Sequence, residues 1–398
     1  MRKSKLMVLS LLAASLAFGF QSCHKDDDDN DNNSSNTTQN PGNNDEKKDD
    51  SGIGNSVPPT KLPALDTDVM FGNKITTVLP DRALNLKIKA SNPSQITVTV
   101  NGKDIFDKKD ATSEIVAVPT SQSGDWTVIV TINDGQNEPK TENLSYRVLQ
   151  VVESVPFTVN GVTFMMNKVY GGTFQMGATE EQLPKALDNE KPVHTLSSFY
   201  IGQTEVTQAL WYAVMGANPS FFKLKDEDNN DINNSSLPVE LVSWNDVQDF
   251  ITKLNSMVTG GKTFRLPTEA EWEFAARGGL NSKGYKYSGS NDPDDVALYT
   301  KDVEGIRVTP VASKQANELG LYDMSGGVCE WCQDWYYLSY SSDAQTNPQG
   351  PSTGENRVYR GGSWDLNETI CRVSWRSGNK PSQSFRDIGF RLALSINE

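Results

Sequence analysis

The sequence predicts an α+β domain with few short helices and much irregular loop, preceded by a small all-β sandwich. In residues 59–152, short runs alternate apolar and polar residues, which is the period of a half-buried strand. Residues 155–398 contain 7 of the 8 tryptophans and three recognisable helix starts, separated by stretches rich in Gly, Asn and Pro. This second part is long enough for one sizeable core.

The first 23 residues have the pattern of a secretory signal. A basic start at residues 2–5 precedes an apolar stretch at residues 6–20, which is shorter than the roughly 20 residues that span a bilayer as a helix. The segment ends Phe-Gln-Ser-Cys, which resembles a bacterial lipoprotein cleavage site. We therefore expect Cys23 to be lipidated and to anchor the protein in a membrane; cleavage without lipidation is the alternative.

Residues 24–58 predict a disordered acidic tether. Residues 26–50 hold nine acids and two lysines, a net of −7 out of the chain's −14. Such a tract has too little apolar surface to offset the entropy of ordering it. An acidic run after a lipidated cysteine also resembles the surface-export signal of Bacteroidetes lipoproteins, so we expect an outer-membrane lipoprotein at the cell surface. A solvated spacer and a periplasm-facing protein are the alternatives.

The net negative charge has no basic cluster beside it, which argues against nucleic-acid binding.

In residues 59–152 the alternating runs are 84–89, 95–100, 126–132 and 144–149. Asn101-Gly102 suits a hairpin turn because both residues tolerate positive φ. The pattern is typical of an immunoglobulin-like β-sandwich, and since no chemistry is visible in it we interpret it as a spacer.

Capping residues predict three helices in the second part. They are Thr207, Ser243 with Asp246, and Thr268 with Glu271. Gly216 is placed to end the first helix, and Gly278-Gly279 the third. Glu269, Glu271 and Glu273 lie in the first turns of the third helix, where the helix dipole favours carboxylates. Capping and surface roles are favoured over a catalytic role for them.

An ordered set of short motifs runs through the second part. It comprises Gly172-Thr-Phe-Gln-Met-Gly177, Glu190-Lys-Pro-Val-His194, Glu205-Val-Thr207, Pro238-Val-Glu-Leu-Val-Ser-Trp244, Phe264-Arg-Leu-Pro-Thr-Glu-Ala-Glu-Trp-Glu273, Gly320-Leu-Tyr-Asp-Met-Ser-Gly326, Glu330-Trp331, Arg360-Gly-Gly-Ser-Trp364 and Gly389-Phe-Arg391. In order and spacing these motifs resemble the formylglycine-generating enzyme (sulfatase-modifying factor) family. The resemblance implies a C-type-lectin-like fold; activity has to be argued separately.

The resemblance also implies where an oxidase site would lie. Oxidising members of the family hold copper with two thiolates about five residues apart, after the Gly-Gly-Ser segment. Counting forward from Ser363 puts Leu366 and Cys371 at these positions, and counting back from Gly389-Phe-Arg391 leaves Cys371 outside the pair. The pair is broken under either count, so copper is not expected. Ser363 and Cys371 would be catalytic only in the oxidase alternative.

The cysteines permit other chemistry. Cys329 stands where the family usually has a tryptophan of the active-site wall, and it forms Cys-x-x-Cys with Cys332. This pair could be redox-active or half of a zinc site, but zinc would need Cys371 and His194 as well. A disulfide between Cys332 and Cys371 is the simpler interpretation for an exported protein, although three cysteines allow three pairings.

The resemblance further implies a structural calcium ion. Family enzymes bind calcium through the segment that matches residues 323–330 here. Asp323 and Glu330 would give carboxylates, and Gly326 and Val328 would give carbonyls. Gly327 replaces the usual asparagine. A metal-free turn is the alternative.

The favoured function is a non-catalytic binding module for an unknown glycan or protein. The expected recognition residues are Trp364, Asp365, Asn367, Glu368, Trp375, Arg376 and Asn379. A core role for the two tryptophans is the alternative. Variable proteins of diversity-generating retroelements have this fold and vary this segment, and the arrangement here resembles theirs, so a variable protein of this kind is a more specific form of the hypothesis. The rival functions are a formylglycine-generating or other oxygen-dependent oxidase, and a structural component of a surface complex.

Overall fold

The computed structural model describes residues 64–178, 192–229, 232, 235–258, 261–301, 308–340 and 343–396. The chain divides into the units Met1–Pro59 and Thr60–Glu398. The predicted signal, the lipidation site Cys23 and the tether up to residue 58 lie outside the described residues. Among the described residues, no helix has the length and apolar character needed to cross a bilayer.

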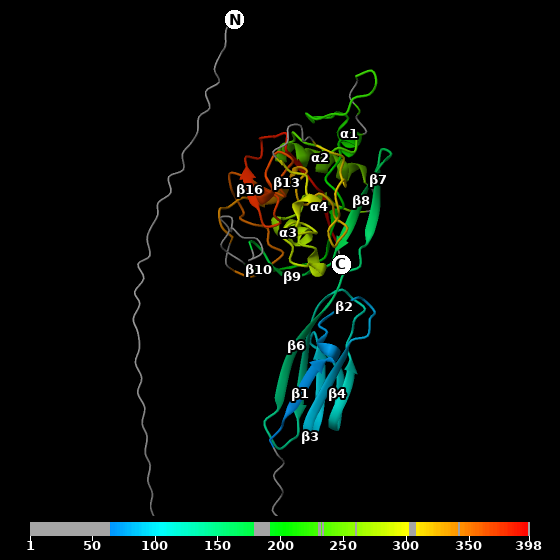
Figure 1. Ribbon diagram of the computed structural model, residues 1–398, viewed down its shortest axis with the longest axis vertical. Helices are drawn as coiled ribbons and strands as arrows, with labels where there is room; N and C mark the ends of the chain where they lie inside the picture. The colour runs from blue at the N-terminus through cyan, green and yellow to red at the C-terminus, as the bar shows by residue number, and fades with distance from the viewer. Residues whose placement is uncertain are drawn as a thin grey trace, which may run out of the picture. The chain divides into compact units, whose positions relative to one another are not determined.

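The N-terminal part of the second unit is a six-stranded sheet (Figure 1). Its strands are β1 (Thr67–Phe71), β2 (Thr77–Val78), β3 (Asn85–Val100), β4 (Lys103–Ala117), β5 (Gly124–Asn133) and β6 (Lys140–Val148), with the 3-10 turn η1 (Gly72–Lys74) after β1. The strand order is β1-β3-β5-β6-β2, and β4 pairs with β3. Alternate residues of β3 are buried along its whole length in one core cluster, as the alternating pattern predicts.

Two details of this sheet concern the predictions. The predicted runs 84–89 and 95–100 belong to one long strand, β3, whose pairing with β4 shifts register between Lys89 and Ser94. Asn101 and Gly102 have φ of 46° and 76° and form the β3–β4 hairpin turn, which confirms the predicted turn. All six strands belong to one hydrogen-bonded sheet, and the immunoglobulin-like sandwich stays a prediction.

The C-terminal part contains three further sheets. Their strand orders are β12-β18-β11-β8-β7, β14-β10-β9 and β16-β15-β13-β17. The strands are β7 (Ser154–Val159), β8 (Val162–Val169), β9 (Gly172–Gln175), β10 (Val193–Leu196), β11 (Phe199–Gly202), β12 (Phe264–Arg265), β13 (Cys329–Trp335), β14 (Gln345–Thr346), β15 (Arg357–Arg360), β16 (Arg376–Asn379), β17 (Ile388–Phe390) and β18 (Ala393–Ser395). The strands are short, with irregular chain between them, as the sequence predicts.

The three predicted helices are present. They are α1 (Gln208–Met215), α2 (Trp244–Met257) and α3 (Glu269–Ala276); the short α4 (Pro293–Val296) and the 3-10 turns η3 (Gly279–Asn281) and η4 (Glu368–Ile370) were not predicted. Thr207 caps α1, and complete capping boxes start α2 and α3. Gly216 ends α1 with φ of 82°. The predicted α+β class with few short helices is confirmed for this part.

Aromatic packing joins the helices to the C-terminal strands. Trp211 of α1 stacks on Phe250 of α2 with ring centroids 5.0 Å apart. Phe390 of β17 meets the edges of both rings, at 6.0 and 5.3 Å. Trp272 of α3 and Trp331 of β13 are fully buried. These rings therefore serve the core, and the surfaces available for function lie on the loops around them.

Candidate functional site

A buried ion pair ties β13 to the end of the chain. Arg391 donates from Nε to Glu330 Oε2 at 2.8 Å and from a terminal nitrogen to Glu330 Oε1 at 2.6 Å. Trp272 Nε1 donates to the same carboxylate at 2.6 Å. Both charged side chains are fully buried. Burial alone lowers the pKa of Arg391, but the Glu330 carboxylate outweighs this effect and raises it.

The acids of α3 form a second set of ion pairs. Glu273 is fully buried and pairs with Arg360 and Arg277. Glu269 pairs through both oxygens with Arg376, at 2.6 and 2.7 Å. The capping role predicted for Glu271 is confirmed, whereas the surface role predicted for the other two acids is wrong, because burial in the core requires each to have a cation partner.

Cys329 interacts with Ser363 and Cys371, which come much later in the sequence, and these two also interact with each other. Both cysteines are fully buried. Burial, followed by the charges of Asp387 and Cys371, raises the pKa of Cys329 well above its usual range, and burial raises that of Cys371 to about 12. Ser363 Oγ donates to Asp387 Oδ2 at 3.1 Å. These thiols are therefore protonated at neutral pH and shielded from solvent.

The predicted disulfide between Cys332 and Cys371 does not form. All three cysteines of the described residues are free and buried. Cys332 packs in the core cluster that contains α3, whereas Cys371 belongs to a different cluster with Tyr287. Gly362 lies so close to Cys371 that a β-carbon there would be 2.8 Å from its sulfur. The Cys-x-x-Cys spacing spans a strand, so its two side chains point to opposite faces.

The predicted calcium segment carries more negative charge than its partners neutralise. Glu205 belongs to one of the motifs but not to the predicted calcium ligands; it is buried, and its Oε1 accepts the Val328 N–H at 2.8 Å. Burial, followed by the charges of Asp323 and Glu330, raises the pKa of Glu205 well above its usual range. Arg391 is the cation of this group. A bound cation would stabilise the ionised form of these carboxyls.

The ligand set itself remains a prediction. No cluster of three His, Cys, Asp or Glu side chains suited to a metal occurs among the described residues, so carbonyls of Gly326 and Val328 would have to complete the set. Glu330 Oε2 already accepts two hydrogen bonds, and Oε1 accepts one, which leaves Oε1 with acceptor capacity. Asp323 Oδ2 accepts the Ala312 N–H at 2.7 Å.

An aromatic surface forms where the C-terminal segment meets the loop after α1. Trp364 meets Phe222 edge-on at 5.1 Å, and Phe222 meets Phe221 edge-on at 5.0 Å. The Arg386 guanidinium lies 4.7 Å from the centre of the Phe221 ring, and Phe221 is 56% exposed. We call these four side chains the aromatic surface. The two loop residues of this surface, Phe221 and Phe222, were not predicted as recognition residues, although two adjacent phenylalanines in a polar loop were a signal for them.

A buried acid supports the loop half of the aromatic surface. Glu240 Oε1 accepts the Phe222 N–H at 2.8 Å, while its Oε2 has no partner. Burial raises the pKa of this carboxyl to about 7. Because Glu240 is fixed beside the core, the two phenylalanines project from a firmly held turn.

The structure distributes the predicted recognition residues unevenly. Asp365 and Asn367 are exposed, while Trp364, Glu368 and Asn379 are partly exposed. Trp375 packs partly buried against Tyr359, with ring centroids 5.9 Å apart. Arg376 is 8% exposed and bound to Glu269, so its assignment to an exposed recognition face is wrong. Its partner lies on α3, which sequence spacing could not show.

A family model fits the part of the chain that contains these sites. The sulfatase-modifying factor enzyme 1-like domain matches residues 157–396. The chain belongs to this family. The match lies within the predicted domain 155–398, and it includes the buried ion pair, the thiols and the aromatic surface.

Individual proteins and one solved structure are also similar to this chain. The chaperone protein LppX of Paenibacillus barcinonensis is 34% identical, covering 55% of this chain and 86% of that protein. The formylglycine-generating enzyme of Streptomyces coelicolor is 32% identical, covering 56% and 87%. Among solved structures, Treponema denticola variable protein 1 has a TM-score of 0.53 at 32% identity, covering 62% of this chain and 99% of that chain.

Removing one partner of the central ion pair is expected to destabilise the domain strongly. Arg391→Met leaves the Glu330 carboxylate buried without its cation, so the free energy of unfolding should fall by about 3–5 kcal/mol. Arg265→Met is the matched control, because its pair with Glu271 is partly exposed and should contribute about 1 kcal/mol or less. Denaturant unfolding measures both. Equal losses in the two variants would contradict the account.

Calcium is expected to stabilise the domain if the segment 323–330 binds it. At a hundredfold excess over the dissociation constant the gain is about 2.7 kcal/mol, and the melting temperature should rise by several degrees over that in chelator. Asp323→Asn should abolish the rise, whereas Asp365→Asn, on an exposed residue, should keep it. A melting temperature that is the same in calcium and in chelator would contradict the prediction.

Proposed function

We propose that the sulfatase-modifying factor domain is a non-catalytic ligand-binding module on a lipid-anchored cell-envelope protein. The observation that carries this proposal is the burial of the thiols: Cys329 and Cys371 are both fully buried. Copper held by two thiolates needs both sulfurs open to the metal, which displaces their protons. Here both sulfurs are shielded from solvent, and burial raises the pKa of both thiols, which opposes the loss of these protons.

The position of the second thiolate supports the same proposal. Leu366 occupies it by forward counting from Ser363, and it packs partly buried against the main core. Its backbone N–H donates to the Ser363 carbonyl at 3.1 Å, so the chain turns immediately after Ser363. An apolar side chain at this turn offers no ligand to a soft metal.

The aromatic surface is the proposed recognition face. Aromatic rings give a large contact area at low cost in conformational entropy, and adjacent small polar residues adapt their hydrogen bonds to the ligand. The contact area comes from Phe221, Phe222, Trp364 and Arg386. The adaptable hydrogen bonds come from the exposed residues Asp365 and Asn367. An unknown glycan or protein is the proposed ligand, and Glu368 and Asn379 lie on the same C-terminal segment.

The similarity to Treponema denticola variable protein 1 supports a binding role. That protein is matched over 99% of its length. We extend the proposal to a variable protein of a diversity-generating retroelement, in which the segment after Ser363 would vary. A near-copy of its coding sequence beside a reverse transcriptase gene would support this extension.

The alternative function is an oxidase. The similarity to the formylglycine-generating enzyme of Streptomyces coelicolor favours it, and so does the retention of Ser363 beside Asp387. Cys329 and Cys371 would then form a rearranged thiolate pair. A structural component of a surface complex is the third function that the sequence allows.

Copper binding separates the first two functions. The reduced protein should bind no stoichiometric Cu(I) in a titration against a competing chelator, and it should not convert a Cys-x-Pro-x-Arg peptide to formylglycine, because both thiols are buried. Cys371→Ser is the matched control and should leave the titration unchanged. One equivalent of Cu(I) bound by two thiolates, with turnover of the peptide and loss of both in Cys371→Ser, would contradict the proposal.

Recognition by the aromatic surface is tested by a glycan and surface-protein binding screen. Trp364→Ala should lower the affinity for any ligand found in the screen by at least about tenfold, because a central aromatic anchor contributes about 2 kcal/mol or more to binding. Ile129→Ala, which removes an exposed apolar side chain of the N-terminal sheet, should have no effect. A ligand bound equally well by wild type and Trp364→Ala would remove the aromatic surface as the recognition face.

A further inference from the structure

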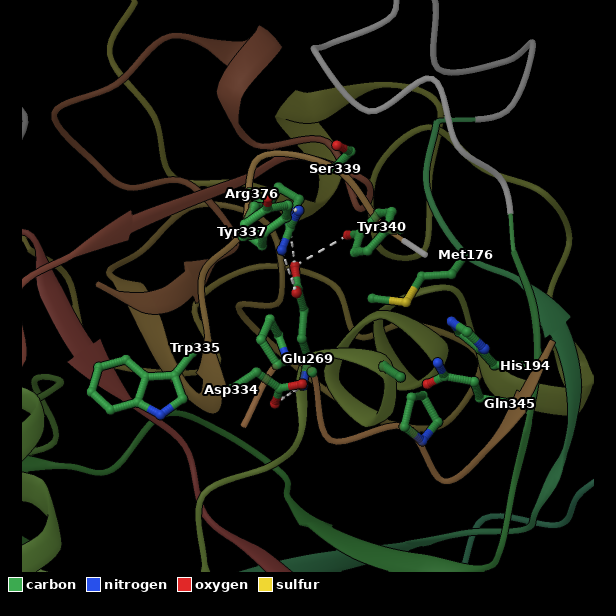
Figure 2. A pocket seen from close by; sticks show the side chains of 14 residues that line it. Met176, His194, Glu269, Asp334, Trp335, Tyr337, Ser339, Tyr340, Gln345 and Arg376 are labelled. Atoms are coloured by element: carbon green, nitrogen blue, oxygen red, sulfur yellow. Dashed lines mark hydrogen bonds and ion pairs between the residues drawn. The ribbon is translucent and has the colours of Figure 1, made fainter. Parts of the chain in front are cut away.

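We infer that a pocket beside α3, separate from the aromatic surface, binds a primary ammonium group carried on an aliphatic chain. The pocket has a volume of about 380 Å³ (Figure 2). This volume accommodates a small organic group and exceeds what a metal ion or a single water needs. Among the described residues no set of His, Cys, Asp and Glu side chains is arranged for a metal.

Asp334 gives the pocket its charge. Glu269 and Arg376 neutralise each other through two hydrogen bonds, and Tyr340 donates to the same carboxylate at 3.1 Å. Asp334 Oδ2 accepts the Glu269 N–H at 2.8 Å, but the described residues form no ion pair with it. Asp334 is therefore the acid of this pocket whose charge, when it ionises, has no ion-pair partner among the described residues.

Burying the ionised carboxylate of Asp334 is unfavourable, and the pKa of this group reflects it. Asp334 is 5% exposed. Burial, followed by the Glu269 charge, raises its pKa to about 8. A cation in the pocket would stabilise the ionised carboxylate and remove much of the penalty for burying it.

His194 lies on the far side of the pocket from Arg376 and adds no charge there. Its side chain is 96% buried and lines the pocket, and its Nδ1 atom, which has no hydrogen-bond partner, is covered by other atoms. Burial lowers the pKa of this histidine, so the ring is neutral. Figure 2 shows it beside Met176 and Gln345. An ammonium group has three N–H donors and no acceptor, so the Asp334 carboxylate is the group that would receive it, and the neutral histidine does not repel it.

The remaining wall favours an aliphatic chain over a flat ligand. Met176, Ala270, Pro348 and Pro351 line it. Two of the aromatic rings at the pocket already stack on cations of the chain, whereas Tyr337, which also lines it, is 65% exposed. Arg376 lies over Tyr340 at 4.2 Å and Arg357 over Trp335 at 3.5 Å. One face of each ring is thus occupied, which leaves less aromatic area for stacking a sugar or a quaternary ammonium.

A primary ammonium group on an aliphatic chain occurs both in a lysine side chain of a protein partner and in a free alkylamine. Isothermal titration calorimetry on the full chain would compare n-pentylamine, Nα-acetyl-lysine amide and the Nε-acetylated form of the latter. We expect at least one amine to bind, and the neutral Nε-acetylated form to bind at least tenfold more weakly. Tighter binding of the lysine amide points to a protein partner, and tighter binding of n-pentylamine to a small molecule; either supports the ammonium site.

Two variants test the site by different routes. Asp334→Asn removes the charge at constant size, and Ser339→Trp blocks the pocket from an exposed position. Both should abolish amine binding, while Asp68→Asn, on an exposed residue of β1, should not. Circular dichroism establishes that each variant is folded. Trp364→Ala should also leave amine binding unchanged, so this test is independent of the aromatic surface.

Three results would overturn the inference. The first is that the wild type binds no amine at 10 mM, a concentration on the order of the weakest specific affinities. The second is equal binding of the charged and the neutral ligands. The third is unchanged amine binding by Ser339→Trp. The last of these does not depend on Asp334→Asn being folded, because Ser339 lies on the surface.

Discussion

The buried pair of Glu330 and Arg391 is the interaction on which the rest of the family domain depends. It fixes β13 against the chain end, and Trp272 of α3 donates to the same carboxylate. Side chains alternate across a strand. With Glu330 directed to Arg391 and α3, Cys332 lies on the α3 side, while Cys329 and Trp331 face the main core. One ion pair thus sets the environment of two cysteines.

This constraint explains the state of the candidate site. Cys329 lies on β13, which holds it in the main core. Cys371 is held by its packing against Gly362 and Tyr287. The oxidase alternative needs a thiolate pair open to copper and peptide. The aromatic surface, by contrast, consists of loop residues outside this framework, where substitutions disturb packing least.

Local signals in the sequence predicted the fold well. The caps at Thr207, Ser243 and Thr268 and the turn at Asn101 depend on residues within four positions, so a short pattern determines them. The site was predicted less well, because its decisive contacts are distant. Arg376 meets Glu269 across 107 residues. Phe222 meets Trp364 across a similar distance, and neither spacing nor composition contains that information.

The central claim is that the thiols of this domain are closed to chemistry in the folded state. Peptide-resolved mass spectrometry of thiol labelling, with a small maleimide on native and on unfolded protein, tests it directly. We expect Cys329, Cys332 and Cys371 to be labelled at the unfolding-limited rate in the native protein, and fully after unfolding. Rapid labelling of both Cys329 and Cys371 in the folded protein would contradict the account and favour an oxidase.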